Sequence, residues 1–114
     1  MGVLSGKKCI PCDAGTSPLK GEKLKKYLDQ LQGWECIEEA LLEKQFSFKN
    51  FKEALDFTNE LGRIAEEEGH HPDIFLSWGK VKVFISTHKI KGLSENDFIL
   101  ADKYDDVYAK KGKK

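Results

Sequence analysis

The sequence lacks both a surplus of charge and a long hydrophobic run. Its 19 basic and 19 acidic residues give a formal net charge of +0 at pH 7. A nucleic-acid binder needs a basic surface to displace counterions from phosphates, so this balance argues against that class. No apolar run approaches the roughly 20 residues of a membrane-spanning helix, and the N-terminus has no apolar segment typical of a secretory signal. We therefore expect a soluble cytoplasmic protein that binds neither nucleic acid nor membrane.

Cysteine is scarce, and its pattern supports no site by itself. An odd count of 3 without a secretory signal argues against a disulfide scaffold. Cys9 and Cys12 have the spacing of a zinc or redox motif. However, a structural zinc site needs a second pair of ligands, and a thioredoxin-like site needs the pair between a strand and a helix. We interpret the two as reduced thiols in an irregular N-terminal arm over residues 1–16.

The chain of 114 residues is long enough for one domain with a modest core. We expect that domain over residues 17–109, followed by a basic tail over residues 110–114. Helical spacing of apolar residues predicts a first helix that stops at Gly33, and a clearer one from about residue 51 to Gly69. One face of the second helix is expected to be buried, formed by Phe51, Leu55, Thr58, Leu61 and Ile64/Ala65.

The remaining segments predict two pairs of strands and a last helix. Residues 34–48 suggest two short strands that turn near Glu38–Ala40, and residues 73–87 suggest a hairpin with Gly79 near its turn. In the second hairpin strand, alternation places Val81, Val83 and Ile85 on one face. Ser94 and Asp97 form a capping-box arrangement at the start of a final helix. The order α-β-β-α-β-β-α predicts an α+β fold, a four-stranded antiparallel sheet with helices packed on one face.

Histidine is also scarce, with 3 in the chain, and two of them are adjacent. His70 and His71 lie between Gly69, which can end a helix, and the rigid Pro72. Both rings therefore leave the helix where the backbone turns. Glu66 lies one helical turn before His70, and a carboxylate there could hold one imidazole nitrogen and leave the other free to act.

The third histidine, His88, follows the last strand on the face opposite its apolar residues. If this strand runs back along the end of the long helix, His88 could meet His70 and His71 across one cleft. Three imidazoles together could supply both an acid and a base near neutral pH. Two alternatives stay open: histidines that only favour a helix dipole, and a catalytic zinc with three histidine ligands. The sequence has no glycine-rich phosphate loop and no serine in a nucleophile elbow.

These residues carry a resemblance to the pterin-4a-carbinolamine dehydratase family, also called the dimerisation cofactor of a homeodomain transcription factor. The family pattern is an acidic residue, three further positions and His-His-Pro, then an aromatic after five or six residues. A histidine follows after nine more residues and an aspartate after at least eight. Here the pattern is met by Glu66, His70-His71-Pro72, Trp78, His88 and Asp97. The likeness covers about residues 18–108, and the family's fold has the predicted order of elements.

The resemblance implies an enzyme without metal or cofactor, which dehydrates a 4a-hydroxytetrahydropterin to the quinonoid dihydropterin. The family thereby recycles the tetrahydrobiopterin-type cofactor of aromatic amino-acid hydroxylases. By this resemblance, His70 and His88 would transfer protons and His71 would hold the substrate near its hydroxyl. The residues expected to bind substrate or orient the histidines are Glu66, Gly69, Ser86, Thr87 and Asp97. Within this set, Glu66 would orient His70, Ser86 and Thr87 would contact the pterin, and Asp97 could instead be only a helix cap.

The resemblance also bears on assembly and on a rival function. Family members form homodimers through sheet edges and animal members form homotetramers, and residues 80–86 could provide such an edge. Animal members also act as transcriptional coactivators by binding a homeodomain protein, so the alternative function is a protein-binding module. Trp78 is expected to serve core or dimer packing. Ile74 stands where animal members have tryptophan, which could alter the pocket.

Overall fold

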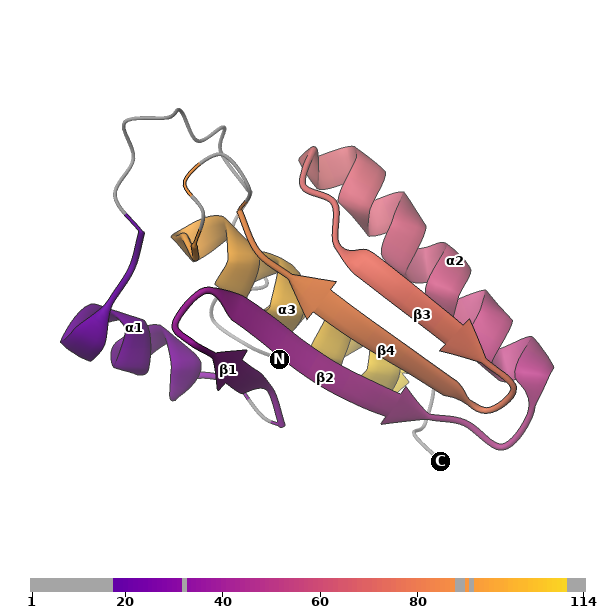
Figure 1. Cartoon of the computed structure of the whole chain (residues 1–114). Coiled ribbons are helices and arrows are strands. Elements are labelled where there is room, and N and C mark those ends of the chain that lie inside the picture. The colour runs from indigo at the N-terminus through magenta and orange to yellow at the C-terminus, as the bar shows by residue number, and fades with distance from the viewer. Residues whose placement is uncertain (1–17, 32, 88–89, 91, 111–114) are drawn as a thin grey trace.

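The computed structural model describes residues 18–31, 33–87, 90 and 92–110. The elements along the chain are α1 (Gly21–Leu28), β1 (Glu35–Ile37), β2 (Leu41–Ser47), α2 (Phe51–Glu68), β3 (Asp73–Ser77), β4 (Lys80–Ile85) and α3 (Glu95–Lys110) (Figure 1). This order confirms the predicted sequence of helices and strands. The main difference in length is α1, which ends at Leu28 rather than continuing to Gly33.

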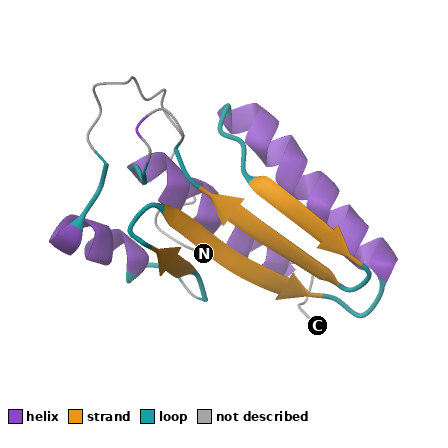
Figure 2. Ribbon diagram, in the orientation of Figure 1, coloured by secondary structure: helices purple, strands orange, loops and turns teal. Residues whose placement is uncertain are grey.

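The four strands form one antiparallel sheet in the order β1-β2-β4-β3 (Figure 2). The expectation that residues 80–86 form an exposed edge is therefore wrong. Val81 of β4 pairs with Phe46 of β2 on one side and with Leu76 of β3 on the other. Lysines alternate with valines along β4, and lysine is common on edge strands. Here the lysines mark only the uncovered face of a central strand, and the edges are β1 and β3.

The helices cover one face of the sheet and enclose the core. In Figure 1, α3 lies behind β2 and β4, and α2 runs along the β3 side of the sheet. The covered face carries the fully buried Val81, Val83 and Ile85, which confirms the alternation predicted for this strand. Aromatic rings join the sheet to α2: the Phe46 and Phe57 rings lie 4.8 Å apart. Burying one such side chain contributes roughly 1.5–3 kcal/mol, so this layer is a main source of the fold's stability.

The buried face of α2 differs from the predicted one. Phe51 and Leu55 are 44% and 38% exposed, whereas Ala54 and Phe57 are completely buried. Apolar residues occupy two overlapping helical stripes on α2, and both have the spacing of a buried face. The stripe through Phe57 is the one that packs on the sheet, because its ring fits against Phe46. The prediction was correct only for its second half, Leu61 and Ile64/Ala65.

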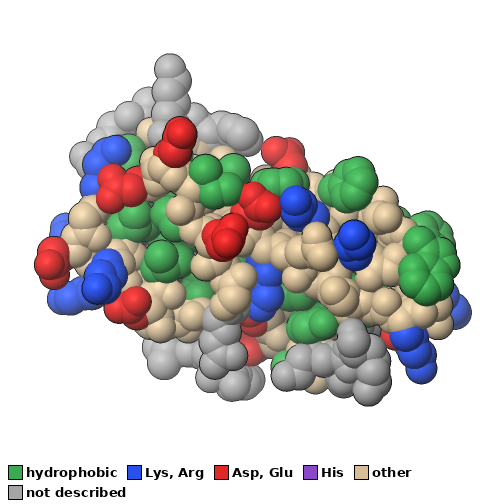
Figure 3. Space-filling view, turned by 60° about the horizontal axis from the view of Figure 1, so that its bottom comes forward, with side chains coloured by type: hydrophobic (Ala, Val, Ile, Leu, Met, Phe, Trp, Pro, Cys, Tyr) green, Lys and Arg blue, Asp and Glu red, His purple; other side chains and the backbone are tan. Residues whose placement is uncertain are grey.

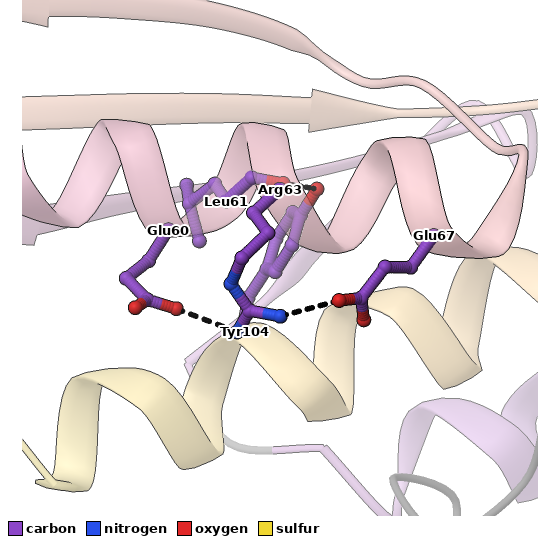
Figure 4. A network of polar contacts seen from close by, with 5 residues as sticks. All are labelled: Glu60, Leu61, Arg63, Glu67 and Tyr104. Atoms are coloured by element: carbon purple, nitrogen blue, oxygen red, sulfur yellow. Dashed lines mark hydrogen bonds and ion pairs between the residues drawn. The ribbon is translucent and has the colours of Figure 1, made fainter.

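The last helix is fixed to α2 by a buried hydrogen bond. The Tyr104 hydroxyl in α3 donates to the main-chain carbonyl of Leu61 at 3.1 Å (Figure 4). On the exposed side of α2, the Arg63 guanidinium donates to Glu60 and Glu67 at 2.8 and 2.6 Å. Exposed pairs of this kind contribute little to stability, so the Tyr104 bond is the more important of the two interactions.

An ion pair between Lys44 and Asp105 lies between the covered face of the sheet and α3. Lys44 of β2 donates to the Asp105 carboxylate at 2.8 Å, and the Trp34 indole N–H donates to the same carboxylate at 3.1 Å. Burial raises the pKa of the Asp105 carboxyl, while the Lys44 ammonium and the Trp34 N–H act in the opposite direction. The Lys44 and Trp34 contacts therefore offset part of the cost of burying this carboxylate, and its pKa stays raised.

The surface mixes all types of side chain. Figure 3 shows hydrophobic groups separated by acidic and basic ones across the face that it presents. This mixing agrees with the balanced charge of the sequence. In the described part of the chain, no helix has the length and hydrophobicity needed to cross a membrane.

Candidate active site

The end of α2 determines where the two adjacent histidines lie. Gly69 has φ 66° and ψ 28°, the left-handed conformation that glycine adopts without strain. The His70 N–H then donates to the Ala65 carbonyl at 3.2 Å, a bond that closes the helix end as in a Schellman motif. The chain leaves the helix axis at Gly69, so His70 and His71 no longer follow helical geometry.

His70 is paired with a buried carboxylate from another element. Its Nε2 lies 2.5 Å from Oδ1 of Asp97 in the first turn of α3. The Asp97 side chain is completely buried, whereas the His70 side chain is 14% exposed. The contact joins residues 27 positions apart in the sequence. It therefore fixes the imidazole at the junction of α2 and α3 while leaving part of the ring accessible.

The Asp97 carboxylate is itself held by two further donors. Its Oδ2 accepts the Ser94 N–H at 2.8 Å and the Thr87 hydroxyl at 2.7 Å. The first bond is the helix cap expected from the sequence. The two interpretations of Asp97 are therefore not exclusive, because one oxygen caps α3 and the other contacts His70.

The Thr87 side chain lies inside the protein. Its hydroxyl contacts Asp97 and Ser94, and its N–H donates to the Gly92 carbonyl at 2.8 Å. Thr87 and Ser94 are both buried. The expectation that the Thr87 hydroxyl contacts the pterin is therefore not supported by its position, since that hydroxyl supports the carboxylate instead. Ser86, at the end of β4, is partly exposed.

Glu66 contacts His71 and not His70, so the predicted pairing is wrong. Oε2 of Glu66 lies 2.6 Å from Nε2 of His71, and both side chains are exposed. The prediction assumed that the helix continued to His70. The left-handed turn at Gly69 instead moves His70 toward α3 and brings His71 over the last turn of α2. Solvent competes for an exposed pair, so Glu66 holds its histidine more weakly than Asp97 does.

Three predicted residues lie outside the described part of the chain: His88, Cys9 and Cys12. The expected meeting of His88 with the histidine pair therefore stays a prediction. Among the described residues, no three histidine, cysteine or acidic side chains lie close enough together to hold a metal ion.

Sequence reasoning missed the pairing of His70 with Asp97. The carboxylate had a sufficient local explanation as the third residue of a helix, and nothing in the local sequence links positions 27 residues apart. The aspartate in the family pattern was the one signal that pointed to the site, since a cap alone can be supplied by several residue types.

The fold and the site together define an α+β protein in which a buried carboxylate holds an imidazole beside a second histidine. Residues 17–107 match the family model described as pterin 4 alpha carbinolamine dehydratase. The chain is 57% identical over 106 residues to a candidate pterin-4-alpha-carbinolamine dehydratase of Alkaliphilus metalliredigens, covering 92% of this chain and 96% of that protein. It is 50% identical over 105 residues to a protein of the same description from Rubrobacter xylanophilus, covering 92% and 98%.

The fold is similar to that of a transcriptional coactivator/pterin dehydratase from Brucella melitensis. The TM-score is 0.76 at 28% identity, over 80% of this chain and 98% of that one. The chain belongs to the pterin-4a-carbinolamine dehydratase family, which confirms the resemblance found in the sequence.

Proposed function

We propose that this protein is a dehydratase that converts a 4a-hydroxytetrahydropterin to the quinonoid dihydropterin by histidine acid–base catalysis. The observation that carries the proposal is the pairing of His70 with the buried Asp97 at 2.5 Å. A partly exposed imidazole oriented by a buried carboxylate is suited to exchange protons with a bound molecule. Family membership supports the choice of a pterin as the substrate.

The reaction needs two proton movements and no change of oxidation state. The hydroxyl on C4a leaves as water after it receives a proton, and the ring N–H loses a proton as the new double bond forms. We assign these transfers to His70 and His88, and the binding of the substrate near its hydroxyl to His71. Imidazole can act as acid and as base near neutral pH, so this chemistry requires neither a metal nor a cofactor.

The substrate would lie against the ends of α2 and β4. We place the Gly69 backbone and Ser86 at its edge, with Glu66 acting on it through His71. Thr87 and Asp97 act from behind His70 rather than by direct contact. The proposed catalytic domain spans residues 17–109, between the arm over residues 1–16 and the tail over residues 110–114. Its role would be to recycle a tetrahydrobiopterin-type cofactor of aromatic amino-acid hydroxylases in the cytoplasm.

A dehydration assay tests this function. Synthetic 4a-hydroxytetrahydropterin loses water without a catalyst, and the absorbance of the quinonoid product follows both rates. We expect the purified protein to accelerate the reaction and a chelator to leave the acceleration unchanged. A rate equal to that without protein would refute the enzymatic function. Loss of the acceleration with chelator, restored by a metal ion, would refute the metal-free mechanism.

A protein-binding module is the second candidate, and the exposed apolar residues of α2 favour it. Phe51 and Leu55 are one helical turn apart and point away from the core. The Brucella melitensis protein of similar fold is described as a transcriptional coactivator as well as a dehydratase. A Phe51→Glu/Leu55→Glu variant should then lose capture of a helical homeodomain-protein segment while the dehydration rate stays unchanged. Capture that survives this change would remove the basis of the second candidate.

We also propose that the protein assembles as a homodimer or homotetramer. Among the described residues, β3 pairs with β4 alone, so its outer edge could accept a strand of a second copy beside the exposed Phe75 and Trp78. Exposed Trp78 is thus better placed for contact with a second copy than for the core. Light scattering measures the mass directly: a mass of one chain at micromolar concentration would contradict this assembly.

A further inference from the structure

Behind His70 lies a series of buried polar contacts formed by Thr87, Ser94 and Asp97. The Ser94 and Thr87 hydroxyl oxygens are 3.0 Å apart, and Thr87 Oγ1 lies 2.7 Å from Oδ2 of Asp97. Oδ1 of the same carboxylate contacts His70 Nε2. Thr87, Ser94 and Asp97 are all buried, at 6%, 5% and 0% exposure. Water is thus largely excluded, and each hydrogen must be supplied by one of these groups.

Counting the hydrogens shows which group donates in each of these hydrogen bonds. The Thr87 hydroxyl has a single hydrogen and donates it to Asp97. Thr87 can therefore only accept in its contact with Ser94, so Ser94 must be the donor there. Oδ2 of Asp97 also accepts the Ser94 N–H and cannot carry a proton itself. The order of donation is Ser94 to Thr87 to Asp97.

With Asp97 as a carboxylate, the contact at Oδ1 fixes the tautomer of neutral His70. An ionised carboxylate only accepts hydrogen bonds, so the atom facing Oδ1 must be an N–H. Neutral His70 then carries its hydrogen on Nε2, and its lone pair is on Nδ1. An imidazole has just two nitrogens, so Nδ1 is the one left to take a proton from a substrate and return it.

We infer that Thr87 and Ser94 are positioning residues, whose ordered hydroxyl groups hold Asp97 so that His70 keeps its Nε2–H form and reacts through Nδ1. The catalytic consequence rests on the proposed function, whereas the tautomer does not. The helix cap alone does not explain the arrangement, since the Ser94 N–H suffices to cap α3. The hydrogen bond from the Thr87 hydroxyl further restricts the orientation of the Asp97 carboxylate. The contrast with His71 agrees with this role, because its partner Glu66 is exposed and has no such support.

The tautomer can be read from the wild-type protein alone. Nitrogen-15 NMR distinguishes a protonated from an unprotonated imidazole nitrogen, so it reports which nitrogen of neutral His70 bears hydrogen. We expect hydrogen on Nε2 and a lone pair on Nδ1. Hydrogen on Nδ1, or an even mixture, would overturn the inference even if the protein proved to be an active dehydratase. The expected tautomer in a protein without dehydratase activity would refute the proposed function and leave the positioning intact.

Variants test the role of Thr87. Thr87→Val keeps the shape of the side chain and removes the hydroxyl, while Thr87→Ser restores it. The matched control is Thr58→Val, because the Thr58 hydroxyl donates to the Ala54 carbonyl within α2, away from the site. We expect Thr87→Val to lower kcat about tenfold with KM within about twofold, since a bond to a charged group that orients the base is lost.

The expected spectrum of Thr87→Val is a mixture of His70 tautomers, and Thr87→Ser and Thr58→Val should resemble the wild type in both readouts. A Thr87→Val enzyme with wild-type kcat and a single Nε2–H tautomer would overturn the positioning role. If Thr87→Val does not fold, Ser94→Ala serves in its place. It leaves the Thr87 bond without its supporting donor, and a wild-type tautomer and kcat in that variant would equally contradict the inference.

Discussion

Replacing Gly62, inside α2, and Gly69, at its C-terminal cap, by alanine is expected to change stability in opposite directions. Gly69 ends the helix in the left-handed region, at φ +66°, whereas Gly62 lies inside it. A Cβ added at either position would meet no atom within 4 Å. Steric contacts are therefore equal in the two variants, and the backbone conformation is what differs.

The magnitudes follow from that conformation. A non-glycine residue loses about 1–2 kcal/mol in the left-handed region, and alanine recovers about 0.4–1 kcal/mol by restricting the unfolded chain. Gly69→Ala should thus lower the free energy of unfolding by about 1 kcal/mol. Gly62→Ala should raise it by about 0.5–1 kcal/mol, the usual difference between the two residues inside a helix.

Circular dichroism during urea and thermal unfolding, at one protein concentration, measures both changes. For a domain of this size, 1 kcal/mol corresponds to a Tm shift of about 4 °C. Gly69→Asn is the control, since asparagine tolerates the left-handed region and should lose less than alanine. Gly69→Ala should also slow dehydration more than Gly62→Ala does, because strain at Gly69 displaces His70. Equal effects of the two alanine variants on stability would refute the reasoning.

Two further predictions concern the contacts of α3. Lys44→Met should lower the free energy of unfolding by about 2 kcal/mol at pH 7, because the partly buried Asp105 loses its cation. Without that cation, burial raises the pKa of Asp105 further, and a carboxyl with a raised pKa binds more protons when folded. The loss should therefore grow as the pH rises from about 4 to 7, and urea titrations showing a larger loss at pH 4 would contradict this sign. Tyr104→Phe should cost about 1 kcal/mol, since the Leu61 carbonyl loses a buried donor. The exposed control, Arg63→Gln, should leave Tm unchanged.

The sequence was sufficient to predict the elements because local signals mark them. Gly69 and Pro72 end α2, the alternation of apolar and polar residues marks β4, and the Ser94–Asp97 pair starts α3. Each of these signals is contained in a short segment of the sequence. Two predictions failed because they depend on tertiary packing: which face of α2 is buried, and whether β4 is an edge strand. The burial of Phe57 rather than Phe51 depends on how α2 meets the sheet, and the central place of β4 depends on which strand pairs with it.

The site was predictable in its residue types and not in its contacts. The pair His70–His71 stood out because histidine is scarce and the pair follows a helix end. The assignment of Glu66 to His70 failed because the helix ends at Gly69. His70 therefore no longer lies one helical turn above Glu66, and His71 occupies that place instead. The partner of His70 is 27 residues away in sequence, and packing of α3 against α2 brings it there.

Comparison of the dehydration rate of the wild type with that of His70→Ala and His88→Ala tests the central claim most directly. Loss of a positioned acid or base typically costs 10²–10⁴-fold in rate. Each variant should fall by about that factor while circular dichroism shows an unchanged fold, and Thr58→Val should retain the wild-type rate. Variants that dehydrate the substrate as fast as the wild type would contradict histidine acid–base catalysis at this site.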